Sequence, residues 1–473
     1  MIIVRSITIL FAIMSALAGA AERPNIVIIL VDDMGYGDPG CYNPESKIQT
    51  PHIDSLARDG MRFTDAHAPG PLCHLSRYGL MTGRYPFRTN VNRWREHATI
   101  KSGRTTIASL LKAQGYRTAM VGKWHLGFEE KGYDQALAGG PVDVGFDSFF
   151  GIRASTDIPD YFYIRDDRAV APPTEKIDDH FSAGDEWTRI QGKFWRGGKI
   201  GAGMKLEDVT PRFTDEAVAV IESHEGMEKA LMLYLALPSP HTPWLPTEEY
   251  VGKSKAGLYG DFTMMVDAMI GRVLGALDKA GMADDTLVIF SSDNGPVWYD
   301  KDVKRLGHDS VGGLRGMKSD AWEGGHRMPF IVRWPGKVAP GTVSGETICF
   351  TDLLATFASI TGYQRKPDEG PDSYDFSKVL LGSQPAGEPV RPQLPMRSGG
   401  GHMCIRVGDW KLIDALGSGG FSKPSKVKKQ PGGPGGQLFN LKDDPAETNN
   451  LYLERADVVD RLRAALESVV AAP

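Results

Sequence analysis

The sequence predicts an α/β protein: a large, mostly parallel mixed sheet between layers of helices, followed by a small C-terminal unit of antiparallel sheet plus helix. Three observations predict this fold. Apolar runs rich in β-branched residues alternate with segments whose apolar residues recur at helical spacing. Four of these runs end in polar residues, as strands do at the ligand-binding edge of a parallel sheet. Short alternating segments near the C-terminus predict the smaller sheet.

The predicted strands of the large sheet are continuous apolar runs, the pattern of strands buried on both faces. They cover residues 25–31, 118–121, 231–237 and 286–290. Helical spacing occupies the segments 105–114, 213–224 and 262–280. Because strands alternate with helices, we expect the strands to run parallel and their carboxyl ends to share one edge.

The C-terminal unit is predicted from shorter signals. Segments 402–407 and 409–413 have the pattern of a hairpin, 437–441 that of a further strand, and 456–469 that of an amphipathic helix. The Pro-rich stretch 364–395 precedes them as a crossing between units. We therefore predict a catalytic domain over residues 22–385 and a C-terminal α+β subdomain over residues 386–473.

Composition is that of an ordinary globular protein. The chain has 473 residues, about three domains' worth at roughly 150 residues each, although one large and one small domain fit equally well. Apolar residues make up 41% and charged residues 24%, which excludes a disordered or collagen-like chain. The 55 glycines and 31 prolines predict many loops. With 54 basic and 59 acidic residues the net charge is −5, so nucleic-acid binding is not favoured.

The N-terminal segment 1–21 has the features of a secretory signal peptide. Arg5 precedes an apolar stretch from residue 7 to about residue 18, and the small residues Ala18, Gly19 and Ala20 follow. The stretch is shorter than the 18 or more residues of a membrane span, so no stable membrane anchor is predicted. We expect an exported protein, periplasmic or secreted. In such a compartment the four cysteines of the chain could form two disulfides.

Polar side chains at two strand ends predict a metal site. Asp32 and Asp33 follow the first strand, and Asp293 and Asn294 follow the fourth. Three carboxylates brought together would repel one another unless a cation bound them. All-oxygen ligation selects a hard ion such as Ca²⁺ or Mg²⁺. The alternative for each pair taken alone is a turn or a helix cap.

Basic side chains at the same edge predict an anionic substrate. Lys123, His125, His241 and Lys318 suit an oxyanion. Cys73 precedes a short helical stretch and lies four residues before Arg77. A helix N-terminus and a guanidinium group stabilise a thiolate, which favours a cysteine nucleophile, as in a phosphatase. That interpretation leaves the metal site unexplained.

The motifs that carry these residues resemble those of the formylglycine-dependent type I sulfatases, an arylsulfatase-like family of the alkaline-phosphatase superfamily. The resemblance covers nearly the whole chain after the signal peptide. It rests on RPNIVIILVDDMGYGD, the Cys73 segment that ends in LMTGR, GYRTAMVGKWHLG, PSPHTPW, VIFSSDNG, GLRGMKSDAWEGGHRMPFIVRWPG and LFNLKDDPAETNNL. It implies an alkaline-phosphatase-like fold and hydrolysis of a sulfate ester, which we expect to be that of a carbohydrate.

The resemblance also implies a role for each residue of the edge. A maturation enzyme would oxidise Cys73 to formylglycine, whose hydrate is the nucleophile. Asp32, Asp33, Asp293 and Asn294 would bind Ca²⁺, in preference to Mg²⁺, together with modified Cys73. Arg77 and Lys123 would hold the formylglycine with help from His125. Lys123, His241 and Lys318 would bind the sulfate, and His241 would protonate the leaving alcohol.

Position 75 departs from the family. The maturation signal is Cys-x-Pro-x-Arg, or less often Cys-x-Ala-x-Arg, and Leu75 occupies the third position here. Two alternatives to a sulfatase stay open, the first because a tetrahedral oxyanion site can serve either ester and the second because of Leu75. One is a phosphate or phosphonate ester hydrolase of the same superfamily, and the other is an unmatured, catalytically silent calcium- or sugar-binding homologue.

Three further features carry paired hypotheses. The insertion 153–205 places Trp187 and Trp195 among lysines and arginines, so these rings either stack on a sulfated sugar or pack the loop onto the domain. The segment 417–436 is either a solvated mobile loop or a lid that brings lysines to the substrate. If Cys73 is the nucleophile precursor, at most one disulfide remains, and we expect Cys41 to be a buried thiol.

Overall fold

A computed structural model describes residues 23–184, 186–188 and 190–472, so the predicted signal peptide lies outside the described residues. Its centre is an 11-stranded sheet in the order β12-β2-β11-β10-β1-β9-β3-β4-β5-β6, with β13 paired to β2. The strands are β1 Asn25–Asp32, β2 Met61–His67, β3 Arg117–Lys123, β4 Ser148–Ile152, β5 Ile164–Arg165, β6 Arg168–Ala169, β9 Leu231–Pro240, β10 Thr286–Ser292, β11 Arg327–Arg333, β12 Thr342–Ser344 and β13 Ile348–Cys349.

The four predicted strands are the adjacent central strands of this sheet. They lie in the order β10, β1, β9 and β3, and every pair among them is parallel. Antiparallel neighbours flank this centre at β11 and β5, so the predicted mostly parallel mixed sheet is confirmed. Each strand runs one to three residues further at its carboxyl end than predicted, and β3 also begins one residue earlier. These extensions bring the polar residues onto the sheet edge itself.

Helices cover both faces of the sheet because the central strands are apolar on both sides. Along β1, Ile26, Ile28 and Leu30 belong to one core cluster, and Val27, Ile29 and Val31 belong to the other. The first cluster includes α2 Cys73–Thr82, α3 Ile107–Ala113, α7 Leu353–Thr361 and α8 Ser377–Leu380. The second includes α1 Pro51–Arg58, α4 Val209–Glu222 and α5 Gly257–Lys279. The three predicted helices are present, and α4 and α5 begin four and five residues earlier than expected.

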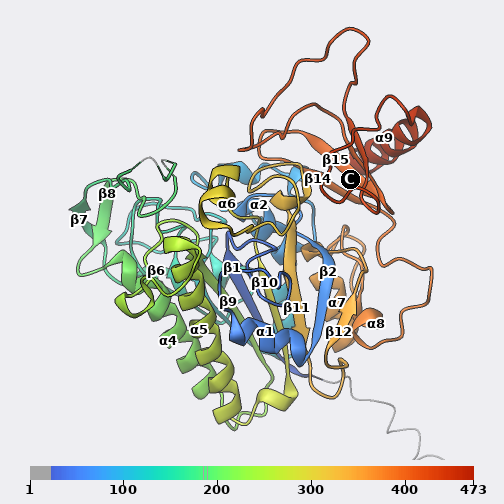
Figure 1. The fold of residues 1–473 in the computed structure, drawn as a ribbon. Coiled ribbons are helices and arrows are strands. Elements are labelled where there is room, and N and C mark those ends of the chain that lie inside the picture. The colour runs from blue at the N-terminus through green and yellow to red at the C-terminus, as the bar shows by residue number, and fades with distance from the viewer. Residues whose placement is uncertain (1–22, 185, 189, 473) are drawn as a thin grey trace, which may run out of the picture.

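The C-terminal unit is a four-stranded antiparallel sheet covered by one helix, and Figure 1 shows it beside the end of the large sheet that carries α2 and α6. Its elements are β14 Leu394–Arg397, β15 Met403–Val407, β16 Trp410–Ile413, β17 Gln437–Asn440 and α9 Ala456–Ala471. The predicted hairpin is the β15–β16 pair. The division at residues 385 and 386 stays a prediction.

The insertion 153–205 contributes a two-stranded sheet, β7 Pro173–Ile177 and β8 Gly198–Gly201. Trp187 packs the loop onto the protein, and Trp195 packs within the loop. The Trp187 ring lies edge-on to Trp244, with ring centroids 5.0 Å apart, and Trp195 stacks on His180 at 4.5 Å. The remaining helix is α6 Asp300–Leu306. In the described part of the chain, every helix is too short or too polar to cross a membrane.

Candidate active site

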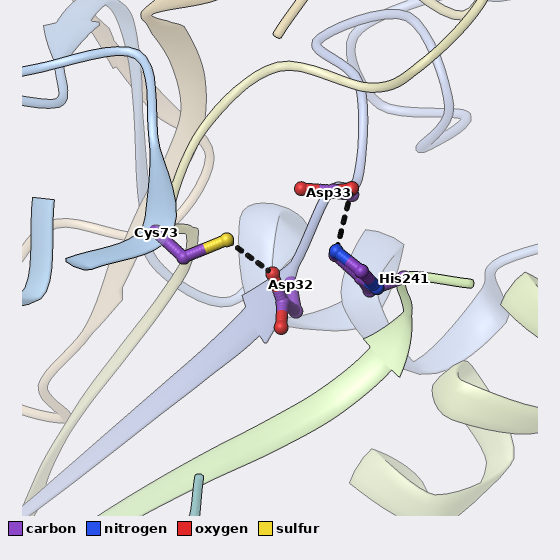
Figure 2. A group of neighbouring side chains, drawn as sticks. All are labelled: Asp32, Asp33, Cys73 and His241. Atoms are coloured by element: carbon purple, nitrogen blue, oxygen red, sulfur yellow. Dashed lines mark hydrogen bonds and ion pairs between the residues drawn. The ribbon is translucent and has the colours of Figure 1, made fainter. Parts of the chain in front are cut away.

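The candidate site lies where the central strands end. Asp32 is the last residue of β1 and Lys123 the last of β3, while His241 directly follows β9 and Asp293 directly follows β10. Asp33 and His125, which continue past the strand ends, adopt left-handed backbone conformations with φ of 62° and 59°. Such conformations are uncommon for residues with a side chain and concentrate at functional sites. Figure 2 shows Asp32, Asp33, Cys73 and His241 turned toward one another at this edge.

Three buried carboxylates form the floor of the site. Asp32, Asp33 and Asp293 are at most 4% exposed. The backbone N–H of Asp33 donates to Asp293 Oδ1 at 3.4 Å, and the backbone N–H of Asp293 donates to the Val31 carbonyl at 3.0 Å. These bonds tie the ends of β1 and β10 together. The predicted cluster of carboxylates is therefore assembled.

Burial and charge act in opposite directions on these carboxylates. Burial raises the pKa of Asp32, but the charges of Lys123 and His241 and other nearby cations together lower it by more. The pKa of Asp32 therefore lies well below the usual range. Burial raises the pKa of Asp293 to about 6, and the neighbouring Asp32 charge adds to that rise. For Asp33 burial outweighs the nearby Lys318 ammonium, so its pKa is also raised. For two of the three carboxylates, burial thus has a larger effect on the pKa than the positive charges beside them.

Asn294 supplies a direct test of whether these residues fit a metal. Its Nδ2 donates to Asp33 Oδ1 at 2.6 Å, while its Oδ1 is buried and has no hydrogen-bond partner among the described residues. Asp32, Asp33, Cys73 and His241 each offer a ligand atom, and these atoms lie within 4.8 Å of one another. An orphaned amide oxygen beside buried carboxylates is a donor set that suits a hard cation. The residues fit the predicted ion.

Cys73 is the first residue of α2 and lies between a carboxylate and an ammonium group. Its Sγ donates to Asp32 Oδ1 at 3.2 Å, and Lys318 Nζ lies 3.3 Å from Sγ. Burial and the Asp293 and Asp32 charges raise the pKa of the thiol well above its ordinary value. The expectation that the helix N-terminus and Arg77 stabilise a thiolate is therefore wrong, because two carboxylates lie near the sulfur.

Arg77, Lys123 and Lys318 neutralise the carboxylates. Arg77 is 1% exposed, and its Nε donates to Asp293 Oδ2 at 2.9 Å. Lys123 Nζ forms a very short contact with Asp32 Oδ2. Lys318 Nζ donates to both oxygens of Asp33, at 2.6 and 2.8 Å. The three predicted cations therefore each pair with one of the three carboxylates.

The two predicted histidines lie on the walls of the site. His241 Nε2 is 3.5 Å from Asp33 Oδ2, and its Nδ1 is 2.5 Å from the Thr242 carbonyl. Burial lowers the pKa of His241 to about 4, and Lys318 adds to the effect. His125 packs edge-on against Trp94, with ring centroids 4.3 Å apart, and its Nδ1 has no partner among the described residues. All ten predicted site residues thus gather at one edge.

Comparison with known proteins decides the family. The sulfatase family model matches residues 24–363, which contain the whole of this site. The chain belongs to the sulfatase family. It is accordingly an enzyme that hydrolyses sulfate esters, and the fold and family predicted from the sequence are confirmed.

Several relatives of this sulfatase match along most of the chain. An N-acetylgalactosamine-6-O-sulfatase of Bacteroides thetaiotaomicron is 33% identical over 95% of this chain and 93% of the relative. Human arylsulfatase A is 34% identical over 80% of this chain and 71% of its own length. A solved sulfatase structure, described with the metabolism of multiple glycosaminoglycans by Bacteroides thetaiotaomicron, superposes with a TM-score of 0.82 at 32% identity, covering 95% of this chain and 99% of that one.

The sulfatase site opens into a pocket of about 310 Å³. Cys73, His125, His241, Lys318 and Asp33 lie on its floor and walls. Of the residues considered from the sequence, Arg196 of the insertion also lines the pocket. Sequence reasoning missed the others: Leu72, His74, Trp94, Arg95, Ser155, Asp157, Ile158, Ile190, Pro240, Thr242, Trp244, Tyr259, Val297 and Phe421. Leu72, His74, Pro240 and Thr242 adjoin Cys73 or His241 in the sequence, and that proximity could have indicated them, whereas no strand end marks those in the loops.

Two of the paired hypotheses can now be judged from the pocket. Neither Trp187 nor Trp195 lines it, whereas Arg196 and Ile190 of the same insertion do. Phe421 of the segment 417–436 also lines it, so this segment reaches the site with an aromatic ring rather than with a lysine.

The cysteines of the sulfatase are all unpaired. Cys41, Cys73, Cys349 and Cys404 form no disulfide. Cys41 is partly exposed rather than fully buried, which corrects the expectation of a buried thiol. Its backbone N–H donates to Asp54 Oδ1 at 2.8 Å, and burial raises the pKa of its thiol above the usual range.

Proposed function

We propose that this sulfatase hydrolyses a sulfate ester of a carbohydrate, with a nucleophile made from Cys73 and a bound calcium ion. The observation that carries the proposal is the placement of Cys73 Sγ between Asp32 and Lys318, in a site where Asn294, bound to Asp33, keeps a buried and unpartnered side-chain oxygen. Oxidised to formylglycine, Cys73 supplies a hydrated aldehyde as nucleophile, and the ion supplies positive charge to the sulfate oxygens. Asp32, Asp33, Asp293 and Asn294 hold the ion.

The basic side chains bind and orient the sulfate. Lys318 Nζ, within 3.3 Å of Cys73 Sγ, reaches an anion seated above that sulfur, and Lys123 lies on the opposite side of Asp32. Arg77 is buried and contacts Asp293 and the Lys123 carbonyl, so its role is to hold the floor in place. Ammonium groups in a site that excludes water stabilise charge on sulfate oxygens more strongly than they would in solution.

His241 is the proton donor for the leaving alcohol. Its Nδ1 is bound to the Thr242 carbonyl, so Nε2 is the nitrogen free to face the substrate. Burial and Lys318 depress the pKa of the ring, and a bound anion raises it again because an opposite charge favours the imidazolium form. The proton then lies on Nε2, at the side of Asp33 and the pocket.

A sugar substrate follows from the relatives and from the pocket. The Bacteroides relative is named for a sulfated aminosugar. A pocket of about 310 Å³ is at the lower end of small-molecule sites, which suits one sugar unit rather than several. We further propose that the protein is exported and that a formylglycine-generating enzyme is its maturation partner.

Ester selectivity tests the function. The expected result is that the wild-type protein releases sulfate from an aryl sulfate and from members of a panel of sulfated sugars. Phosphate release from the matched aryl phosphate should be slower by orders of magnitude. Cys73→Ala should abolish sulfate release while calcium binding and the thermal unfolding midpoint stay close to wild type. Faster release of phosphate than of sulfate would contradict the proposal in favour of the phosphate ester hydrolase.

Maturation at Leu75 is tested separately. Leu75 lies on α2 and is buried in the core, while Arg77 on the same helix contacts Asp293, so Leu75 is compatible with the geometry of the site. Intact-mass analysis of the Cys73 peptide, from protein made in its native host, should give the mass of an aldehyde in place of a CH₂SH group. An unmodified thiol would instead favour the silent homologue.

A further inference from the structure

The carboxylate of Asp157 lines the pocket, although it does not lie at the end of a predicted strand. Asp157 is 5% exposed and lies in the insertion between β4 and β5. Arg196 Nη1 donates to Asp157 Oδ2 at 2.5 Å and to the Asp157 carbonyl at 3.1 Å. These two bonds fix the orientation of the side chain and hold its negative charge in the pocket wall.

The second oxygen of this carboxylate has no partner. Asp157 Oδ1 is buried without a hydrogen bond among the described residues, and it lies 4.0 Å from His241 Nδ1, which is itself engaged by Thr242. Ser155 Oγ is also buried and unpartnered, and it lines the same pocket. Buried polar atoms are nearly always hydrogen-bonded, so unpartnered ones on one pocket wall call for a ligand.

The chemistry of the carboxylate defines that ligand. An ionised carboxylate only accepts hydrogen bonds, so its partner must be a donor. A second sulfate or a phosphate is excluded, because like charges brought together in a desolvated pocket repel. Under the proposed function the lysines bind the sulfate oxygens, and Lys318 Nζ lies 3.3 Å from Cys73 Sγ. The donor is therefore on the alcohol part of the ester.

We propose that Asp157, oriented by Arg196, binds a free hydroxyl of the sugar unit that carries the sulfate and so sets the specificity of the enzyme. This inference rests on the proposed function and names its substrate more closely. The preferred substrate has an unmodified hydroxyl near the ester, and a second sulfate on that hydroxyl blocks binding. Ser155 Oγ is placed to share the same hydroxyl or its neighbour.

The test compares substrates that differ in this hydroxyl. The substrates are a sulfated monosaccharide that the wild type hydrolyses, its deoxy analogue lacking the adjacent hydroxyl, and an aryl sulfate. The variants are Asp157→Asn, which keeps the shape but not the charge, and Glu130→Gln as control. Glu130 pairs with Arg153 at 3.2 Å in the same region of the structure but does not line the pocket.

The expected result is a loss of kcat/KM that is selective for the sulfated sugar. Asp157→Asn should lower kcat/KM for the sulfated sugar by about 10- to 100-fold, the usual effect of losing a charge-assisted hydrogen bond, and most of the loss should be in KM. The loss on the aryl sulfate should be at least about tenfold smaller. The wild type should have a low kcat/KM for the deoxy analogue, and Asp157→Asn should not lower it further, because both changes remove the same contact. Glu130→Gln should match the wild type on all three.

Two results would overturn the inference without touching the proposed function. Equal losses on the sugar and the aryl sulfate would mean that Asp157 only positions His241. Unchanged kcat/KM on the sugar would mean that no hydroxyl binds there. Arg196→Ala is a second variant for the case in which Asp157→Asn fails to fold. It should lower kcat/KM for the sulfated sugar by a smaller factor than Asp157→Asn does, and again by more than it lowers kcat/KM for the aryl sulfate. Failure of the proposed function is a separate outcome, in which the wild type releases sulfate from none of the substrates.

Discussion

At the scale of single residues, the site is balanced before any ligand enters. Its three carboxylates face three permanent cations, and each pair is buried; these residues are Asp32, Asp33, Asp293, Arg77, Lys123 and Lys318. A divalent cation would therefore add a net positive charge. That surplus is what an anionic sulfate neutralises, so metal and substrate favour each other's binding.

Arg77→Ala should destabilise the protein strongly. The guanidinium is 1% exposed and bonds to Asp293, and its removal leaves a buried carboxylate unpaired. The expected loss in the free energy of unfolding is about 3–5 kcal/mol, measured by urea denaturation with excess chelator present. Arg272→Ala, which breaks an exposed pair with Asp215, is the control and should cost at most about 1 kcal/mol. Similar losses in both variants would contradict the argument.

Asn294→Ala should weaken calcium binding and leave the fold intact. The Asn294 Oδ1 atom makes no hydrogen bond among the described residues, so its loss removes a proposed metal ligand without breaking a contact of that atom. The variant also loses the Nδ2 bonds to Asp33 and the Gly295 carbonyl. We expect the calcium dissociation constant, measured by isothermal titration calorimetry, to rise by at least about tenfold. Asn449→Ala, at an exposed position, should bind calcium as the wild type does. Unchanged affinity in Asn294→Ala would remove Asn294 from the ligand set.

At the scale of elements, the sequence predicted the buried centre of the sheet and missed its margins. A run such as residues 231–237 lacks charged residues because helices cover both its faces, and that pattern is easily recognised. Strands β2 and β14 mix polar and apolar residues over short lengths, since the two faces of each strand have different surroundings. Their pairing depends on residues far away in the chain, which no local pattern encodes.

The same division holds for the site. Residues that follow a strong strand could be placed together from the sequence because parallel strands deliver their ends to one edge. Asp157 and Phe421 reach the pocket from loops, and only the folding of the insertion and of the C-terminal unit brings them there. The raised pKa of the Cys73 thiol was also beyond prediction, since it depends on how deeply the thiol is buried and on the two carboxylates near the sulfur.

A buried carboxylate between two helices gives a pH-dependent stability. Asp267 on α5 accepts hydrogen bonds from the backbone N–H groups of Ile53 and His52 at the start of α1, at 2.8 and 3.2 Å. Burial raises the pKa of Asp267 to about 7, although these bonds lower it in part. Unfolded aspartate releases its proton near pH 4, so between about pH 4 and 7 only the folded chain keeps it, and stability falls as the pH rises.

Asp267→Asn should remove this dependence. In urea denaturation at pH 5 and pH 8, with chelator present, the free energy of unfolding of the wild type relative to the variant should fall with rising pH. The slope is at most about 1.4 kcal/mol per pH unit. Asp215→Asn, at an exposed position on α4, should show no such trend. A difference that stays constant, or that grows with pH, would contradict the assignment.

At the scale of the whole molecule, a buried ionic network joins the C-terminal sheet to the catalytic domain. Lys411 on β16 lies 2.9 Å from Glu323 Oε1 and 2.9 Å from Glu447 Oε1, and it is 1% exposed. His67, Glu323 and His326 offer potential metal ligands within 4.8 Å of one another. Lys411 Nζ lies 3.2 Å from His326 Nε2, so the ammonium group already occupies the position that a cation would take.

Lys411→Met should therefore weaken the attachment of the C-terminal sheet. The methionine fills the space of the lysine stem but leaves Glu447 buried without its cation, while Glu323 keeps Arg327 at 2.6 Å. We expect a loss of about 3–5 kcal/mol in the free energy of unfolding. Glu447→Gln in the same chain should recover much of it, because the unpaired charge is then gone.

The readout of this variant separates attachment from local damage. Glu323 lies five residues after Lys318, and Phe421 reaches the pocket from the C-terminal unit, so a loosened unit should also lower kcat/KM for the sulfated sugar. The double variant should restore stability and activity together. Lys442→Met, at an exposed position just after β17, is the control and should change neither. If Lys411→Met lost stability but kept full activity, the C-terminal unit would be a separate support and not part of the substrate site.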